Sequence, residues 1–138
     1  VASVDVDSLE TDFPDPARLD FNAVLKGATW LNVAQFPRME FASSRIDVTG
    51  LNTLRIHGNL TLHGVTRPIV LEATFNGGYA GHPMDPNARI GFSAQATLKR
   101  SEFGIAYGIP APGTTVGVSD EVDVAIEAEF TGPPLVPR

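Results

Sequence analysis

The sequence predicts an all-β domain of antiparallel strands with one short helix. Three observations predict it: six runs in which apolar and polar residues alternate with a period of two, Gly, Pro or Asn at the ends of these runs, and a single segment with helical spacing. Such alternation is typical of strands with one buried face and one solvated face. The pattern alone fits a β-sandwich or a β-barrel, and the length of the runs favours a barrel.

The strands follow one another along the whole chain. In chain order they are expected over Ser3–Asp7, Met39–Val48, Leu54–His63, Ile69–Asn76, Ile90–Lys99 and Glu121–Phe130. All but Met39–Val48 alternate cleanly. The third and fourth runs are expected to form a hairpin around an HGVTRP turn, with pairs that keep the apolar residues on one side: Leu62–Ile69, Leu60–Leu71, Gly58–Ala73 and Ile56–Phe75.

One segment breaks the alternation. Apolar residues recur at roughly helical spacing between Pro16 and Asn32, so we predict a short helix there, capped by Asp12 or Asp15. Phe36-Pro37 is expected to end this excursion and lead into the next strand.

Composition narrows the class of protein. The chain has 138 residues, enough for one domain, which we assign to residues 1–131. The last residues, 132–138, resemble the remnant of a thrombin-cleavable tag, and the start at Val1 without methionine suggests a removed upstream segment. A net charge of −6 argues against a nucleic-acid binder. No apolar run is long enough to cross a bilayer, and the absence of cysteine excludes disulfides and thiolate chemistry.

Candidate catalytic and metal-binding residues are few. His57 and His63 share one side of a strand but lie six residues apart, roughly 20 Å, which is too far for one metal ion. His82 lies in a Gly/Pro loop, where a solvated side chain is the simpler interpretation. There is no nucleophile elbow and no glycine-rich phosphate loop. We therefore predict no catalytic residue, no metal site, no bound cofactor and no enzymatic activity.

The apolar sides mix large residues with small ones such as Gly58 and Ala73, which leaves room in the middle of the wall. Two interpretations stay open at this point. Large side chains from across the core fill the space, which makes the protein a structural or interaction module, or the space is a dry lumen for a hydrophobic tail.

Two stretches carry a family resemblance. "GNLTLHGVTRPIVLEATFNG" (58–77) and "IGFSAQATLKRSEFGI" (90–105) closely resemble the YceI family of bacterial polyisoprenoid-binding proteins, and the similarity extends over most of residues 2–130. The resemblance implies a lipocalin-like antiparallel β-barrel whose lumen holds the isoprenoid tail of a polyprenyl or quinone-like amphiphile. The lumen-facing candidates it implies are Phe41, Ile56, Leu60, Leu62, Leu71, Phe75, Phe92 and Ile126, with Trp30, Leu31 and Phe36 covering an opening.

The resemblance also implies partners and a location. Family members carry additional residues before the strand equivalent to the first one here. We therefore expect a partial barrel, completed either by a missing N-terminal segment or by a second copy in a homodimer. The expected ligand is a hydrophobic lipid rather than a nucleic acid. The expected location is the periplasm or the outside of the cell, with the cytoplasm as the alternative.

Overall fold

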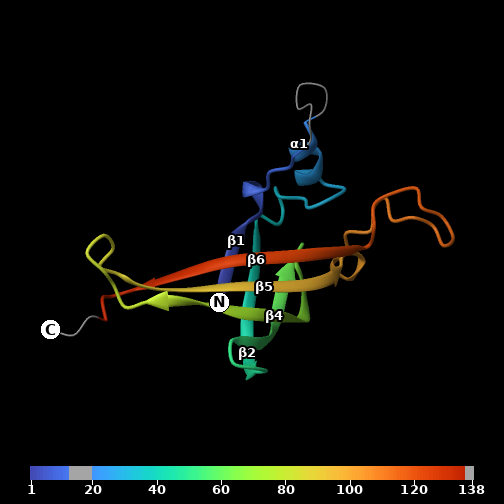
Figure 1. Ribbon diagram of the computed structural model, residues 1–138. Coiled ribbons are helices and arrows are strands. Elements are labelled where there is room, and N and C mark those ends of the chain that lie inside the picture. Colours follow the sequence, from blue (N-terminus) through green and yellow to red (C-terminus); the bar gives the residue numbers. More distant parts are fainter. Residues whose placement is uncertain (13–19, 136–138) are drawn as a thin grey trace. The chain divides into compact units, whose positions relative to one another are not determined.

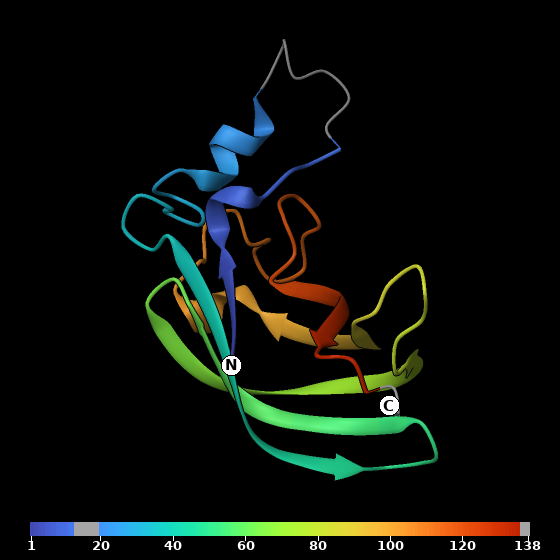
Figure 2. The ribbon, with the colours of Figure 1, turned by 90° about the vertical axis from the view of Figure 1, so that its left-hand side faces the viewer.

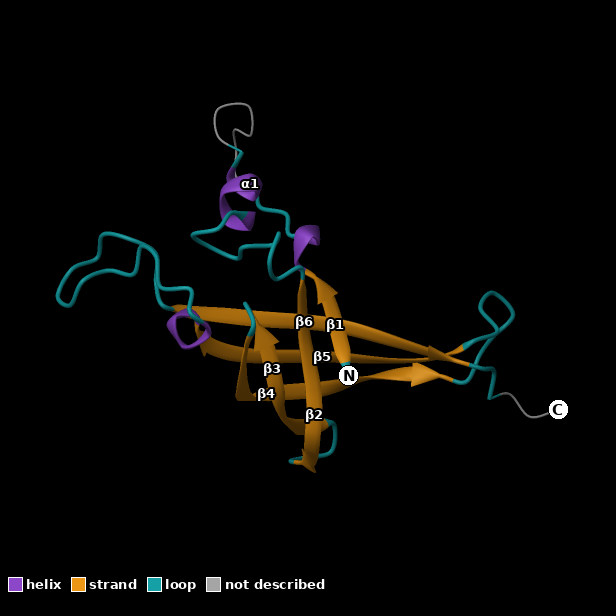
Figure 3. Ribbon diagram, turned by 180° about the vertical axis from the view of Figure 1, so that it is seen from behind, coloured by secondary structure: helices purple, strands orange, loops and turns teal. Residues whose placement is uncertain are grey.

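The computed structural model describes residues 1–12 and 20–135, and strands dominate this part of the chain (Figure 3). The strands are β1 (Ala2–Asp5), β2 (Arg38–Val48), β3 (Thr53–Leu62), β4 (Val65–Tyr79), β5 (Ala88–Lys99) and β6 (Glu121–Gly132). The helices are α1 (Phe21–Lys26) and two 3-10 turns, η1 (Val6–Ser8) and η2 (Arg100–Phe103). Figure 1 labels most of these elements along the chain.

The six strands form one sheet in the order β1-β2-β3-β4-β5-β6, so each strand is hydrogen-bonded to its neighbours in sequence. The predicted fold class, all-β and antiparallel with a short helix, is confirmed. Each predicted run corresponds to one strand, and β6 extends through Gly132, one residue beyond the predicted end of the domain. No helix in residues 1–12 or 20–135 is long and apolar enough to span a bilayer.

The helix is shorter than predicted. It covers Phe21–Lys26 and is capped by Asp20, whose carboxylate accepts from the Ala23 N–H at 3.1 Å, rather than by Asp12. Asp15 and the predicted start at Pro16 lie outside the described residues. After Gly27 the chain continues in turns, which end where β2 begins, directly after Pro37, as predicted.

The β3–β4 hairpin is tighter than predicted. His63 and Gly64 both have positive φ, 55° and 74°, which is the conformation of a two-residue type I′ turn, and β4 begins at Val65. The Phe75 N–H donates to the Asn52 carbonyl instead of facing Ile56, so the pairing is displaced by four residues from the predicted register. An even displacement keeps the apolar residues on one side, which is why the predicted faces hold although the predicted pairs do not.

The chain divides into two compact units. Unit 1 consists of Val1–Ser43, Gly58–Ile69 and Leu98–Val122. Its core is a cluster of four buried residues, Leu60, Leu62, Phe103 and Ile105, against which half-buried side chains pack, among them Trp30, Leu31 and Phe41. Phe103 is the most deeply buried, with 1% of its surface exposed.

Unit 2 consists of Ser44–His57, Val70–Thr97 and Asp123 onward. It contains the β2–β3 hairpin end, visible in Figure 2, and most of β4, β5 and β6. Its buried apolar residues are Leu71, Ala73 and Ala94. Two of the three are alanines, so this unit has few large side chains that are fully removed from water.

Candidate functional site

The candidate ligand surface in unit 2 is a row of three aromatic rings on the apolar sides of β4, β5 and β6. Phe75 is paired with Phe92 across the β4–β5 ladder, and their ring centroids are 5.4 Å apart. Phe92 is 5.9 Å from Phe130 in an edge-to-face arrangement. The next pair on the same face of the ladder is Ala73 and Ala94, so small residues stand beside the rings.

This aromatic row is only partly covered. Phe75 and Phe92 are half-buried, and 57% of the surface of Phe130 is exposed. Ile90, on the same strand as Phe92, is 44% exposed. An apolar surface of this kind is favourable for a hydrophobic ligand, because binding removes it from water.

The predicted lumen residues fall into two groups. Leu60 and Leu62 are buried within the unit 1 cluster, and Phe41, Trp30 and Leu31 pack against that cluster. Phe36 also belongs to unit 1, where its ring lies 4.7 Å from that of His63. The remaining candidates are in unit 2: Ile56, Leu71, Phe75, Phe92 and Ile126. Their role in ligand binding stays a prediction.

The space predicted at Gly58 is occupied. A Cβ atom added to Gly58 would lie 2.5 Å from the Phe41 ring and 2.5 Å from the Ala42 carbonyl oxygen. In unit 1 the glycine therefore makes room for a side chain of the neighbouring strand rather than for a ligand.

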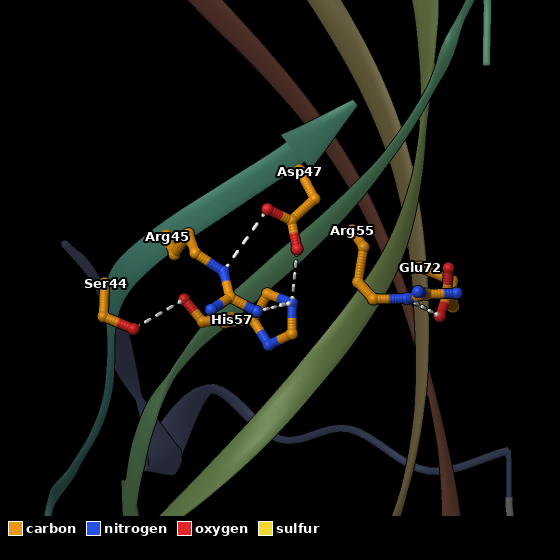
Figure 4. Close-up of polar contacts among 6 residues, drawn as sticks. All are labelled: Ser44, Arg45, Asp47, Arg55, His57 and Glu72. Atoms are coloured by element: carbon orange, nitrogen blue, oxygen red, sulfur yellow. Dashed lines mark hydrogen bonds and ion pairs between the residues drawn. The ribbon is translucent and has the colours of Figure 1, made fainter. Parts of the chain in front are cut away.

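A polar cluster on β2, β3 and β4 of unit 2 is drawn in Figure 4. His57 Nε2 lies 3.0 Å from the Asp47 carboxylate and 3.1 Å from the Arg45 guanidinium. A protonated Nε2 donates to Asp47, whereas a deprotonated Nε2 accepts from Arg45. Beside it, Arg55 donates to Glu72 at 2.8 Å, and this bond raises the pKa of Arg55.

The pair of His57 and Asp47 has two of the three parts of a nucleophile-activating triad, but the third is missing. The nearby hydroxyl, Ser44 Oγ, donates to the His57 backbone carbonyl at 3.3 Å and not to the imidazole. Since nucleophilic catalysis requires the hydroxyl to hydrogen-bond to the base, this cluster links neighbouring strands and has no arrangement for acyl transfer.

His63 has a structural position that the sequence pattern did not indicate. We predicted it at the end of a strand, on the polar side, but it lies in the turn. Its Nδ1 is 3.1 Å from the Phe103 carbonyl oxygen, which can only accept, so Nδ1 carries the proton. Its Nε2 is buried and has no hydrogen-bond partner among the described residues. His63 thus connects the HGVTRP turn to the KRSEFGI segment.

Arg100 is the main residue that sequence reasoning missed. Its side chain is buried, and its guanidinium donates four hydrogen bonds to backbone carbonyls, those of Ser119, Ile105, Tyr107 and Val118, at 2.7–2.9 Å. The guanidinium carbon also lies 5.0 Å from the centroid of the Trp30 ring. The loop from 104 to 120 is therefore organised around one buried cation.

Two hollows lie beside charged side chains of β4, β5 and β6 in unit 2. One, of about 440 Å³, is lined by Phe92 and Ile90 as well as by Arg89, Glu127 and Glu129, among others. The other, of about 590 Å³, is lined by Glu72, Gln95 and Asp123, among others. Because burial of a charge against an apolar chain is unfavourable, the charged parts of these hollows do not suit an isoprenoid tail. Among the described residues, no group of three His, Asp or Glu side chains is arranged to hold a metal ion.

Comparison with known proteins agrees with this description. The family profile described as "YceI-like domain" matches residues 1–130. A UPF0312 protein of Pseudomonas putida is 38% identical over 105 residues, covering 75% of this chain and 50% of that protein. One of Azotobacter vinelandii is 36% identical over 125 residues, covering 88% and 59%. The chain thus spans about half the length of the curated relatives it matches.

Solved structures show the same fold. A YceI protein of Campylobacter jejuni superposes with a TM-score of 0.77 at 25% identity, over 94% of this chain and 70% of that one. BcnA of Burkholderia cenocepacia gives a TM-score of 0.73 at 25% identity, over 94% and 72%.

These findings define the structural class of the protein, which is an all-β protein whose antiparallel strands match those of β-barrel structures. The chain belongs to the YceI-like family.

Proposed function

We propose that this protein binds an amphiphilic lipid with an isoprenoid tail, of the polyprenyl or quinone type, without catalysing a reaction. The observation that carries the proposal is the half-exposed row of Phe75, Phe92 and Phe130 in unit 2. Membership of a family known for polyisoprenoid binding supports it. The tail would lie along the aromatic row.

Burial of the tail supplies the free energy of binding. Each CH₂ group removed from water contributes about 0.8 kcal/mol. A few prenyl units therefore contribute several kcal/mol, partly offset by the cost of association. No acid–base pair is required for this binding.

The experiment is organic extraction of the purified chain followed by mass spectrometry, after expression in cells rich in isoprenoid lipids. We expect a co-purified prenyl lipid. Phe130→Asp introduces a charge at an exposed ring and should reduce the amount of retained lipid at least several-fold. Val116→Asp, at an exposed residue of unit 1, is the matched control and should leave it unchanged. Extracts free of lipid, or equal losses in both variants, would contradict the proposal.

The alternative function is a structural or interaction module with a core filled by its own side chains. The position of the Phe41 ring against Gly58 favours this for unit 1. It predicts lipid-free protein whose stability does not change when prenyl lipids are added.

The proposed location is the periplasm or the outside of the cell, with the cytoplasm as the alternative. Fractionation of cells that express the complete natural gene, followed by immunodetection, distinguishes the two.

A further inference from the structure

Asn76 is the one asparagine of the chain that is followed by glycine. The side-chain carbonyl of an asparagine can be attacked by the backbone nitrogen of the next residue, which closes a cyclic imide and expels ammonia. A side chain on that next residue hinders the attack, and glycine has none. Since every other asparagine precedes a residue with a side chain, the sequence favours this reaction at Asn76.

The strand geometry is interrupted at this pair of residues. In the β4–β5 ladder Phe75 pairs with Phe92 and Gly77 pairs with Gly91, so Asn76 is an extra residue with no partner opposite it. Such a residue forms a β-bulge, at which the ladder is locally disrupted. Gly77 has a φ of 105°, and a Cβ added to it would meet nothing within 4 Å. The backbone at Gly77 therefore has room to move toward the Asn76 side chain.

The Asn76 side chain belongs to a chain of hydrogen bonds that connects β4, β5 and β6. The Ser93 hydroxyl donates to the Glu127 carboxylate at 2.6 Å. Since a hydroxyl has a single proton, Ser93 must accept in its 2.8 Å contact with Asn76, and the Asn76 amide donates through Nδ2. An amide can donate this hydrogen bond, whereas a carboxylate in its place cannot.

We propose that Asn76 deamidates spontaneously and is thus a site of covalent modification. The Gly77 nitrogen bonds to Asn76 Cγ and loses its proton, the bond from Cγ to Nδ2 breaks, and Nδ2 leaves with that proton as ammonia. Water then adds to one carbonyl carbon of the cyclic imide and breaks the bond from that carbon to the ring nitrogen. The product is aspartate or isoaspartate, according to the carbonyl that reacts. Because the attack is intramolecular, it requires neither a partner nor a sheet edge.

Deamidation removes the donor of this hydrogen-bond chain. A carboxylate at position 76 and the Glu127 carboxylate would compete for the single Ser93 proton, and the two like charges would repel each other. In isoaspartate the main chain also gains a CH₂ group directly after Phe75. We therefore expect the sheet to loosen locally. An effect on lipid retention rests on the proposed function, whereas the reaction itself does not.

The parent chain tests the reaction without any substitution. The folded protein is kept in mildly alkaline buffer for several weeks, and samples are digested with trypsin and analysed by fragmentation mass spectrometry. One tryptic peptide, residues 56–89, contains Asn59, Asn76 and Asn87, because trypsin does not cut between Arg67 and Pro68. A sample digested before incubation gives the conversion caused by digestion. We expect conversion at Asn76 to be at least about tenfold faster than at Asn59 and Asn87. Equal rates would overturn the proposal.

A second measurement shows whether the folded chain reacts. The rate at Asn76 in concentrated urea gives the reactivity of the unfolded chain. We expect the folded chain to react less than about a thousandfold more slowly, because reaction through global unfolding alone would slow it by about a thousandfold or more. A slowing of that size would mean that the fold protects Asn76, and would overturn the proposal.

Asn76→Gln identifies the reacting group. The variant keeps an amide donor, but its longer side chain would have to close a larger ring, so conversion at position 76 should fall at least about tenfold. Unchanged conversion would mean that the attack does not come from the Gly77 nitrogen.

Asn76→Asp tests the structural consequence, because it reproduces the aspartate product. We expect the backbone amides around Ser93 and Glu127 to exchange with deuterium at least about threefold faster than in the parent. Asn59→Asp makes the same change in charge at an exposed residue of β3 and should exchange like the parent. Parent-like exchange in Asn76→Asp, or an equal increase in both variants, would contradict the expected loosening. None of these measurements uses lipid, so their outcome is independent of the proposed lipid binding.

Discussion

The two units of this chain differ in how far the apolar faces of their strands are covered by other side chains. In unit 1 the face is covered by the chain itself, with Phe103 and Ile105 from the segment after β5 lying against Leu60 and Leu62 of β3. In unit 2 the corresponding side chains are smaller, and Phe130 and Ile90 stay in contact with water. The difference indicates that unit 1 supplies most of the stability, while unit 2 leaves apolar surface in contact with water.

The polar groups differ in the same way. Unit 1 has a buried cation, Arg100, which is satisfied by carbonyl oxygens of the loop it organises. The ion pairs of unit 2, such as Arg55–Glu72 and Arg45–Asp47, are at the surface. Surface pairs contribute little to stability, whereas a buried guanidinium must keep its partners.

The largest effect is expected for Phe103→Ala. Phe103 is 1% exposed, and its removal leaves a cavity at the centre of the unit 1 cluster, so we expect a loss of about 3–5 kcal/mol in the free energy of unfolding. Urea unfolding followed by the fluorescence of Trp30, the only tryptophan of the chain, measures it. Phe130→Ala in unit 2, at a ring that is 57% exposed, is the control and should cost under about 1 kcal/mol. Equal losses would contradict the contrast between the units.

The second prediction concerns Arg100→Met. The variant removes a buried cation and leaves backbone carbonyls of the 104–120 loop without donors, so we expect a loss of about 3 kcal/mol and faster proteolysis within that loop. Arg100→Lys keeps the charge but cannot make the same fork of hydrogen bonds. Its free energy of unfolding should lie between those of the parent and Arg100→Met. Arg67→Met, at an exposed arginine, is the control. An Arg100→Met protein with an intact loop would remove the proposed role of this side chain.

What the sequence could predict here follows from the periodicity of side chains. The strands were found because alternation is a local property, and the faces of β3 and β4 were correct for the same reason. The register was wrong because HGVTRP resembles a six-residue loop, whereas His63 adopts a positive φ and lets the turn close over two residues. Position 63 is a histidine, so the sequence lacks the Asn-Gly or Asp-Gly pair that is typical of a two-residue type I′ turn.

Two further features depend on tertiary contacts and have no local signal. Arg100 lies in a motif of the family resemblance, yet nothing in the spacing of KRSEFGI shows that four carbonyls from later in the loop surround it. In β2 the odd-numbered Phe41 packs against the apolar cluster, whereas the odd-numbered Asp47 bonds to His57. Odd-numbered residues therefore do not all lie on the same face of β2. This explains why apolar and polar residues do not alternate regularly in its sequence.

A smaller effect is expected for Gly58→Val. The added Cβ would clash with the Phe41 ring and with a backbone carbonyl, and the backbone cannot yield as a flexible side chain does. We expect a loss of about 1–3 kcal/mol in the free energy of unfolding. Gly132→Val at the end of β6, where a Cβ meets nothing within 4 Å, is the control from unit 2 and should be close to neutral. A stable Gly58→Val protein would mean that the wall of unit 1 has free space after all.

The smallest effects are expected from two carboxylates, one in each unit, whose pKa values are lowered. In unit 2 the Tyr79 hydroxyl and the Arg89 guanidinium both donate to Asp85 and hold the pKa of this carboxyl below its ordinary value of 3.8. In unit 1 the Ser101 hydroxyl and N–H donate to Asp120 at 2.7 and 2.8 Å and lower its pKa in the same sense.

A carboxyl group with a lower pKa in the folded state stabilises the fold fully above its unfolded-state pKa, and this contribution is lost as the pH falls through the folded-state pKa. We therefore expect stability to fall on the acid side of pH 3.8, and both Asp85→Asn and Asp120→Asn to flatten this part of the curve. Carboxyl ¹³C titration by NMR gives the two pKa values directly, and ordinary values would contradict the expectation. Because both residues are half-buried and thus still in contact with solvent, the slope should also weaken in high salt, which a fully buried pair would resist.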